Sequence, residues 1–280
     1  MSENPMFLRQ RLRDRLKRAR ESAGMTQQQV AEAFAWSPSK VIRLENGKIG
    51  VNITDAMALV QHYGIAEDEA AQLIDLAKAA RQPSWYAPYR SVMSPELEAY
   101  ISYEESASIV RNYERNVVPG LLQTEEYARS IQKEVWSGSE LEMSVELRMR
   151  RQRALESTEA EFFFILDESV LRRTIGNETI MQQQLDALLR FNDYPNVQIQ
   201  YVPFSKGMYP LFRTPYQIFE FSGGTDDLVA YLENPEGDVL LSEAMPKYGS
   251  RRTPADYLDA FWDVERNVAE DIRDGVAVAA

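Results

Sequence analysis

Three side chains that donate hydrogen bonds, those of Ser39, Lys40 and Arg43, lie close together in the sequence. Because Ser39 and Lys40 precede Arg43 by four and three residues, all three share one face of a helix, opposite the apolar Val41 and Leu44. The guanidinium of Arg43 can donate to O6 and N7 of guanine together, and Ser39 and Lys40 can reach bases or phosphates. Such a helix fits the major groove of DNA. The alternative is that Arg43 only forms a surface ion pair with a nearby acid.

Two helices are expected to precede this one. Apolar residues recur at helical spacing from about residue 7 to 23, and Gly24 ends that helix. Thr26 and Gln29 then form a capping box, in which the Thr26 hydroxyl accepts from the Gln29 amide and the Gln29 side chain reaches back. The second helix therefore begins at this box and directs Val30 inward.

The helix that carries Arg43 follows a short break at Ala35-Trp36. Ser37 can cap it, and Pro38 can occupy the first helical position, where its missing N–H costs nothing. Asn46-Gly47 ends it, and two further helices are expected at about 54–63 and 66–81. Five short helices make a compact bundle, and the tight turn between the second and third has helix-turn-helix geometry.

The charge is distributed unevenly along the chain. Residues 1–50 carry a net charge of +5, residues 51–81 carry −3 and residues 82–280 carry −14. A basic excess at one end favours a face for a negatively charged partner there, although the chain as a whole is acidic. The alternative is that the Arg-rich first helix is simply a solvated amphipathic face.

Residues 25–34 and 37–48 resemble the helix-turn-helix regulators of the Xre, Cro and phage-repressor type, through their Thr-Gln opening and Leu-Glu-Asn-Gly-Lys ending. The resemblance implies that four side chains hold the DNA backbone, those of Gln27, Ser37, Asn46 and Lys48. These contacts would set the register without carrying sequence information.

The same resemblance implies a structural salt bridge between Arg20 and Glu45. One position departs from the family, because the turn residue that is usually glycine is Ala35 here. A left-handed conformation at Ala35 would cost roughly 1 kcal/mol, and burial of Trp36 would compensate. Ile42 is ambiguous, since it would either touch a thymine methyl group or cover the edge of the core.

Residues 82–94 contain two prolines and several aromatic residues, which predicts a linker that docks rather than moves freely. The domain boundaries are therefore expected at 1–81 for the helix-turn-helix domain, 82–94 for the linker and 95–280 for an acidic α+β domain. The elements expected in this domain are helices at about 95–113, 124–136, 140–156, 178–191 and 254–273, and strands at about 161–166, 197–202, 216–221, 228–233 and 238–241. They predict a small sheet flanked by helices.

Residues 109–129, 148–152, 165–168 and 195–200 resemble the C-terminal domain of a large group of actinobacterial Xre-type regulators. The function of that domain is unknown, so the resemblance implies a regulator without implying its signal. Members of the group are often encoded beside a small partner protein. Relatives bind DNA as two-fold pairs, so we expect a homodimer whose contacts lie mostly in residues 90–280.

Several kinds of chemistry are excluded or disfavoured. There is no cysteine, and His62 is the single histidine, which we expect to be a partly buried packing residue. No catalytic or nucleotide-binding motif is present, so we expect no enzyme activity, no metal and no cofactor. The acidic pairs Asp167-Glu168 and Asp226-Asp227 are expected to be solvated surface, although Asp167 can cap the turn that follows it.

The sequence has no apolar run long enough to span a membrane and no secretory leader, so a cytoplasmic location is expected. The favoured function is a sequence-specific transcriptional regulator, such as a repressor, that binds a double-stranded operator and is controlled through its C-terminal domain by a ligand or a partner protein. The alternative is an antitoxin-like or partner-sequestering interaction module whose DNA binding is autoregulatory.

Overall fold

The computed structural model describes residues 4–157, 159–222, 228–233, 238–242 and 252–279. The chain divides into two compact units, Met1–Ala87 and Pro88–Ala280. The boundary between them falls inside the segment 82–94, for which the sequence predicts a linker. Each unit has a hydrophobic core of its own.

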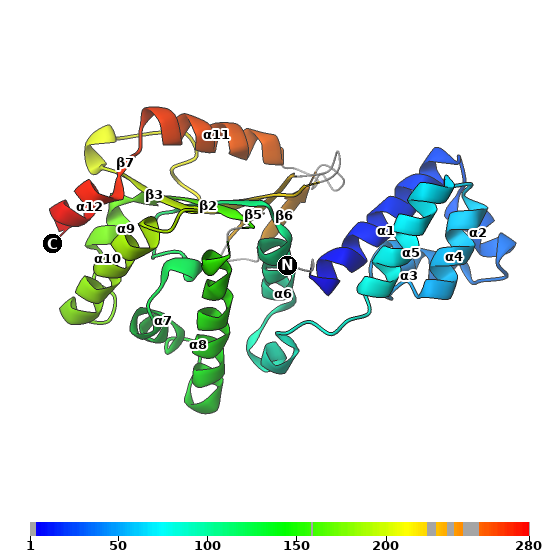
Figure 1. Ribbon diagram of the computed structural model, residues 1–280, viewed down its shortest axis with the longest axis horizontal. Coiled ribbons are helices and arrows are strands. Elements are labelled where there is room, and N and C mark those ends of the chain that lie inside the picture. Colours follow the sequence, from blue (N-terminus) through cyan, green and yellow to red (C-terminus); the bar gives the residue numbers. More distant parts are fainter. Residues whose placement is uncertain (1–3, 158, 223–227, 234–237, 243–251, 280) are drawn as a thin grey trace. The chain divides into compact units, whose positions relative to one another are not determined.

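The first unit is a bundle of five helices, as predicted (Figure 1). Its core is built from apolar side chains that recur at helical spacing, so each helix buries one face. The residues with the least exposed surface include Leu12, Val30, Ala56 and Leu73. The helices are α1 (Pro5–Ser22), α2 (Gln27–Ala33), α3 (Pro38–Glu45), α4 (Ile53–His62) and α5 (Glu67–Ala79).

The local signals at the start of α2 and α3 act differently. The capping box is present, since the Gln29 amide donates to Thr26 Oγ1 at 3.2 Å and the Thr26 amide donates to Gln29 Oε1 at 2.8 Å. Pro38 begins α3, and Ser37 occupies the N-cap position, but the Ser37 side chain makes no capping hydrogen bond. The predicted side-chain cap by Ser37 is therefore wrong. The fixed φ of Pro38 favours the start of the helix without that hydrogen bond.

Aromatic residues anchor the segment around the boundary. Tyr86 is buried in the first unit, where its hydroxyl donates to Asn4 Oδ1 at 3.2 Å. Tyr89 belongs to the second unit and donates to Glu146 Oε1 at 2.7 Å. The short 3-10 helix η1 (Ala87–Val92) begins at the last residue of the first unit. The segment is thus docked on the first unit just before the boundary and on the second unit just after it.

The second unit contains a mixed sheet of seven strands in the order β6-β5-β4-β1-β2-β3-β7. Strands β1, β2 and β3 are parallel, and the other pairs are antiparallel. This is the expected α+β class, although the sheet is larger than predicted. The strands are β1 (Ile109–Glu114), β2 (Glu161–Asp167), β3 (Val197–Val202), β4 (Tyr216–Glu220), β5 (Leu228–Leu232), β6 (Val239–Ser242) and β7 (Glu270–Asp271).

Helices lie on both faces of this sheet (Figure 1). On one face, Tyr257 of α11 packs against Tyr216 with ring centroids 5.3 Å apart. On the other face, Tyr100 of α6 packs against Phe219 at 5.5 Å. The helices are α6 (Pro95–Ser106), α7 (Glu125–Gln132), α8 (Gly138–Gln152), α9 (Glu168–Arg172), α10 (Glu178–Asn192), α11 (Pro254–Asn267) and α12 (Ile272–Ala279), with 3-10 turns η2 (Gly120–Leu122), η3 (Arg153–Glu156) and η4 (Phe204–Lys206).

Two predicted helices are wrong at their ends. The helix expected at 95–113 stops at Ser106, and its last residues form β1, which lies between β2 and β4. A central strand is covered on both faces, so it lacks the alternating pattern that would have distinguished it from a helix. The helix expected at 254–273 ends at Asn267, because Glu270–Asp271 pairs with the open edge of β3.

The acidic pair that follows β2 is only partly as expected. Asp167 caps α9, since its Oδ1 accepts from the Ser169 amide at 3.0 Å. Glu168, however, is buried, and its carboxylate accepts from Arg172 Nε at 2.5 Å and from the Phe204 amide at 2.6 Å. The prediction of a solvated surface is therefore wrong for Glu168. The pair Asp226-Asp227 lies outside the described residues.

Candidate nucleic-acid interface

Helix α3 buries one side and exposes the other. Val41 and Leu44 are 2% and 4% exposed, while Ser39 and Arg43 are exposed on the opposite side. Ile42 is 42% exposed, so it does not cover the core edge. Three of the four side chains that the resemblance assigns to the DNA backbone are also exposed: Ser37, Asn46 and Lys48.

Arg43 is held loosely. Its Nε donates to the Ser39 carbonyl oxygen at 3.3 Å, one turn earlier in α3. In the described part of the chain no carboxylate forms an ion pair with Arg43, so the surface ion pair that was its alternative role has no partner there. The terminal guanidinium nitrogens therefore remain available to an acceptor outside the protein.

Lys40, unlike Arg43, has its charged group held by two other side chains. Its Nζ lies 3.0 Å from Asp55 Oδ2 of α4 and 3.4 Å from the centroid of the Trp36 ring. The side chain is half-buried as a result. To reach DNA, Lys40 would have to exchange both interactions for a phosphate or a base.

Glu45 links α1, α2 and α3. It accepts from Arg20 Nε at 2.6 Å and Nη2 at 3.1 Å, which is the salt bridge that the resemblance implied. Its Oε2 also accepts from Gln27 Nε2 at 2.7 Å. The hydrogen bond to Glu45 raises the pKa of Arg20. Gln27 is therefore oriented by Glu45 at the N-terminus of α2, where backbone N–H groups favour an anion.

The turn between α2 and α3 contains a strained residue. Ala35 has a φ of +51°, the left-handed conformation anticipated for this position. Trp36 packs on Phe34, with ring centroids 4.8 Å apart, and lies under Lys40. Packing around Trp36 thus offsets the local strain.

Replacing Ala35 with glycine is expected to stabilise the first unit by roughly 1 kcal/mol, because glycine adopts this φ without a Cβ clash. Amide hydrogen exchange in α2 and α3 of the full-length protein would measure the gain. Ala33→Gly, at the last residue of α2, is the matched control and should destabilise, because Ala33 is helical and glycine has a lower helix propensity than alanine. A loss of protection in the Ala35→Gly protein would contradict the assignment of strain.

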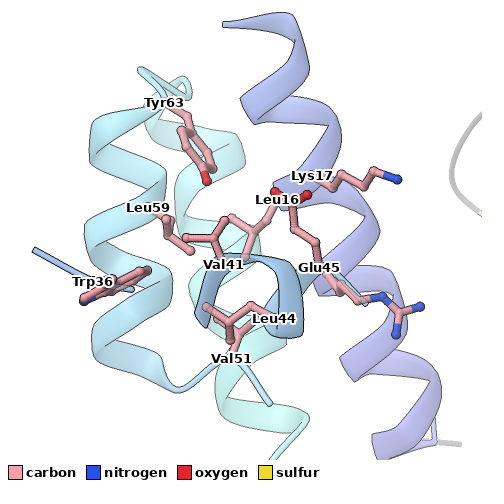
Figure 2. Close-up of a pocket in the computed structure, with 10 residues that line it drawn as sticks. Leu16, Lys17, Trp36, Val41, Leu44, Glu45, Val51, Leu59 and Tyr63 are labelled. Atoms are coloured by element: carbon pink, nitrogen blue, oxygen red, sulfur yellow. The ribbon is translucent and has the colours of Figure 1, made fainter. Parts of the chain in front are cut away.

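A pocket lies directly under α3. Figure 2 shows Leu16, Val41, Leu44, Val51 and Leu59 converging on it from α1, α3, α4 and the chain after α3. Trp36, Glu45 and Tyr63 line it too, and burial raises the pKa of Tyr63 to about 12. The apolar lining holds the buried side of α3, so its polar side faces outward.

Sequence reasoning overlooked Arg13 of α1. A Cβ at Gly47 would collide with its guanidinium, so Arg13 lies against the turn that follows α3. Gly47 has a φ of +70°, which glycine adopts without strain. Arg13, which is half-buried and whose Nε lies 3.1 Å from Asp14 Oδ1, therefore brings a guanidinium from α1 to the turn that carries Asn46. The sequence shows Gly47, but it does not show that Arg13 lies beside it in the folded chain.

His62 is a half-buried packing residue, as expected. Its ring lies 5.0 Å from Phe34 and 6.0 Å from Tyr63. Within the described ranges, no group of three or more His, Cys, Asp or Glu side chains is placed to hold a metal ion. Within the same ranges, no helix is long and apolar enough to cross a membrane.

Comparison with known proteins identifies two domains. A family model described as a helix-turn-helix domain matches residues 11–73. A second model, described as a domain of unknown function (DUF5753), matches residues 97–252. No curated protein matches the chain, and no solved structure does. The first match runs from within α1 to the middle of α5 and includes the exposed side of α3.

Proposed function

We propose that this chain, which belongs to the DUF5753 family and carries a helix-turn-helix domain ahead of that domain, is a sequence-specific transcriptional regulator. The observation that carries the proposal is α3, which is apolar where it meets the core and presents Ser39 and a loosely held Arg43 outward. A helix of this kind enters the major groove and reads base edges with its exposed side chains.

The exposed residues divide by the contact they would make. Arg43 would read a guanine, and Ser39 and Lys40 would contact bases or phosphates. Ser37, Asn46 and Lys48 would hold the phosphate backbone, together with Arg13 beside them. Gln27, oriented by Glu45, would contact a phosphate at the N-terminus of α2.

We further propose that the protein binds its operator as a homodimer and that a ligand or partner protein acts through the second unit. One helix-turn-helix buries too little surface for tight operator binding, so two copies are needed. If the second unit carries the dimer contact, sedimentation should show residues 88–280 to be dimeric when the full-length protein is. A monomeric fragment beside a dimeric full-length protein would contradict this assignment.

Two variants test the proposed reading of DNA. Arg43→Ala should weaken binding to an operator selected from random duplexes by about 1–3 kcal/mol, and should weaken binding to random DNA little, because base contacts carry the specificity. Lys48→Ala is the matched control, since a phosphate contact contributes on every sequence. It should weaken both kinds of binding similarly and reduce the slope of log K against log salt by roughly one.

Fluorescence anisotropy of the full-length proteins at two salt concentrations measures both effects. If Arg43→Ala loses equal binding free energy on operator and on random DNA, Arg43 contacts a phosphate and not a base. Failure of the unchanged protein to select any sequence from a random library would contradict the proposed function itself.

A further inference from the structure

Two buried amides in the second unit have side-chain oxygens to which no described residue donates a hydrogen bond. Asn112 on β1 and Gln217 on β4 are register partners across the sheet and are 3% and 2% exposed. Asn112 Oδ1 and Gln217 Oε1 are both buried and unpaired. Buried amide oxygens are nearly always hydrogen-bonded in folded proteins, so two side by side mark a place for a group that donates.

The two amides face α6 and α8. Their neighbour Arg111 lies toward α11, with its guanidinium carbon 5.5 Å from the Phe261 ring. Because side chains alternate along a strand, Asn112 and Glu114 project to the opposite face. Gln217 is on that face as well, since the next residue of the same alternation, Phe219, packs on α6. Asn112, Gln217 and Glu114 therefore share one part of the sheet surface.

Among the residues that the structure describes, no Lys or Arg side chain forms an ion pair with Glu114, and of the nearby charges that of Arg115 acts to lower its pKa. Glu114 Oε1 accepts from the amides of Arg115 at 2.9 Å and Asn116 at 3.2 Å, which fixes the carboxyl group at the end of β1. Burial, with a contribution from Glu233, raises the pKa of Glu114 to about 7. A cationic donor beside it would reverse this effect.

In the described ranges no carboxylate forms a salt bridge with Arg148 of α8, although Glu233 and Glu104 lie near enough to act on its charge. Arg148 donates to the uncharged amide of Gln123 at 2.8 Å, and its neighbour Arg151 is already paired with Glu104. Burial and Arg151 lower the pKa of Arg148 to about 10. Arg148 nevertheless keeps part of its surface accessible, and Glu233, which acts on both Arg148 and Glu114, is exposed. The Arg148 end of the cluster can therefore be reached from outside, while the two amide oxygens lie buried behind it.

We propose that Asn112, Gln217, Glu114 and Arg148 bind a small zwitterion of the amino-acid class. Its ammonium would donate to the two amide oxygens and to the carboxylate of Glu114, which together match its three N–H groups. Its carboxylate would pair with the guanidinium fork of Arg148. The bound zwitterion would be the ligand that regulates DNA binding through the second unit. Only this regulatory role rests on the proposed function.

The test is a binding measurement on the full-length protein without DNA. Each common L-amino acid is screened for an increase in melting temperature, and the most effective one is titrated by calorimetry. The expected result is saturable binding of one ligand per chain. The amine and the carboxylic acid derived from that amino acid, each lacking one charged group, should bind far more weakly.

Two variants test whether the amino acid binds at this cluster. Arg148→Met and Gln217→Leu should each weaken the affinity at least about tenfold, because each removes a partner of a charged group. Gln217→Leu also removes an unpaired buried oxygen at similar volume, so it should fold at least as stably as the unchanged protein and keeps the test open if Arg148→Met does not fold. Gln198→Leu, an exposed amide on β3, is the matched control and should leave the affinity unchanged.

If an ordered water satisfies both amides instead, no amino acid should raise the melting temperature. That outcome overturns the inference. Binding that survives both variants overturns the location of the site. Operator binding by the same preparation is measured in parallel. Intact operator binding without amino-acid binding contradicts this inference alone, and the reverse contradicts the proposed function alone.

Discussion

Replacing Arg20 with methionine should lower the free energy of unfolding of the first unit by about 3–5 kcal/mol, because the variant leaves the carboxylate of Glu45, whose side chain is only 9% exposed, without its counterion. Arg20 is 7% exposed and donates to both oxygens of Glu45. The variant keeps the apolar stem of the side chain, so the loss would come from the missing charge. Gln27, which is uncharged, would still donate to Glu45.

Amide hydrogen exchange in α1–α3 of the full-length protein measures this loss. The double variant Arg20→Met/Glu45→Leu should recover most of it, because no buried charge is left unpaired. Arg15→Met is the matched control on the same helix, since Arg15 pairs with the exposed Glu69 at 3.1 Å, and it should cost no more than about 1 kcal/mol. A double variant as unstable as Arg20→Met would contradict the explanation by an unpaired charge.

A similar loss is expected in the second unit for Arg151→Met. Arg151 donates through Nε and Nη2 to the two oxygens of Glu104, both at 2.9 Å, and the two side chains are 6% and 1% exposed. Methionine at position 151 would leave the carboxylate of Glu104 buried and unpaired, at a cost of about 3–5 kcal/mol. Burial between α6 and α8 leaves water no access to replace the guanidinium.

The pH dependence of this loss is a further check. The unpaired carboxyl of Glu104 can be neutralised by a proton at low pH, so the variant should bind more protons when folded than when unfolded. Its stability should therefore fall as pH rises, and its deficit should be smaller at pH 5 than at pH 8. Denaturant unfolding of the full-length protein at both pH values measures it. Arg273→Met, which breaks an exposed pair with Asp193, is the control and should cost less than about 1 kcal/mol at either pH. A deficit that does not change with pH would contradict the role given to Glu104.

Local signals account for the success of sequence reasoning in the first unit. Gly24, the Thr26 and Gln29 capping box and Pro38 each act within one helical turn, so they indicate where helices begin and end wherever the unit folds. The 3.6-residue period then assigns Val41 to the core and Arg43 to the outside. The exposed side of α3 can thus be recognised from the amino-acid sequence alone.

The tertiary structure decided which of those outward residues are free. Lys40 and Arg43 are equivalent by spacing, yet Lys40 is bound to Asp55 and Trp36 because α4 lies beside it. Gln27 is occupied by Glu45 because the end of α3 lies beside the start of α2. Such partners come from residues distant in the sequence, and no local pattern encodes their approach.

The second unit shows the same limit more strongly. Residues 109–114 become the central strand because β2 and β4 pair with both of their edges, and burial on both faces removes the alternation that identifies a strand. Asn112 and Gln217 look like ordinary polar residues until that pairing places their unpaired oxygens side by side. The sequence by itself thus determined the helices of the first unit and the exposed side of α3, since these depend on neighbours within a few residues. The order of the sheet, the state of each candidate DNA contact and the polar cluster were decided only by the tertiary structure, because they depend on pairing and burial between distant segments.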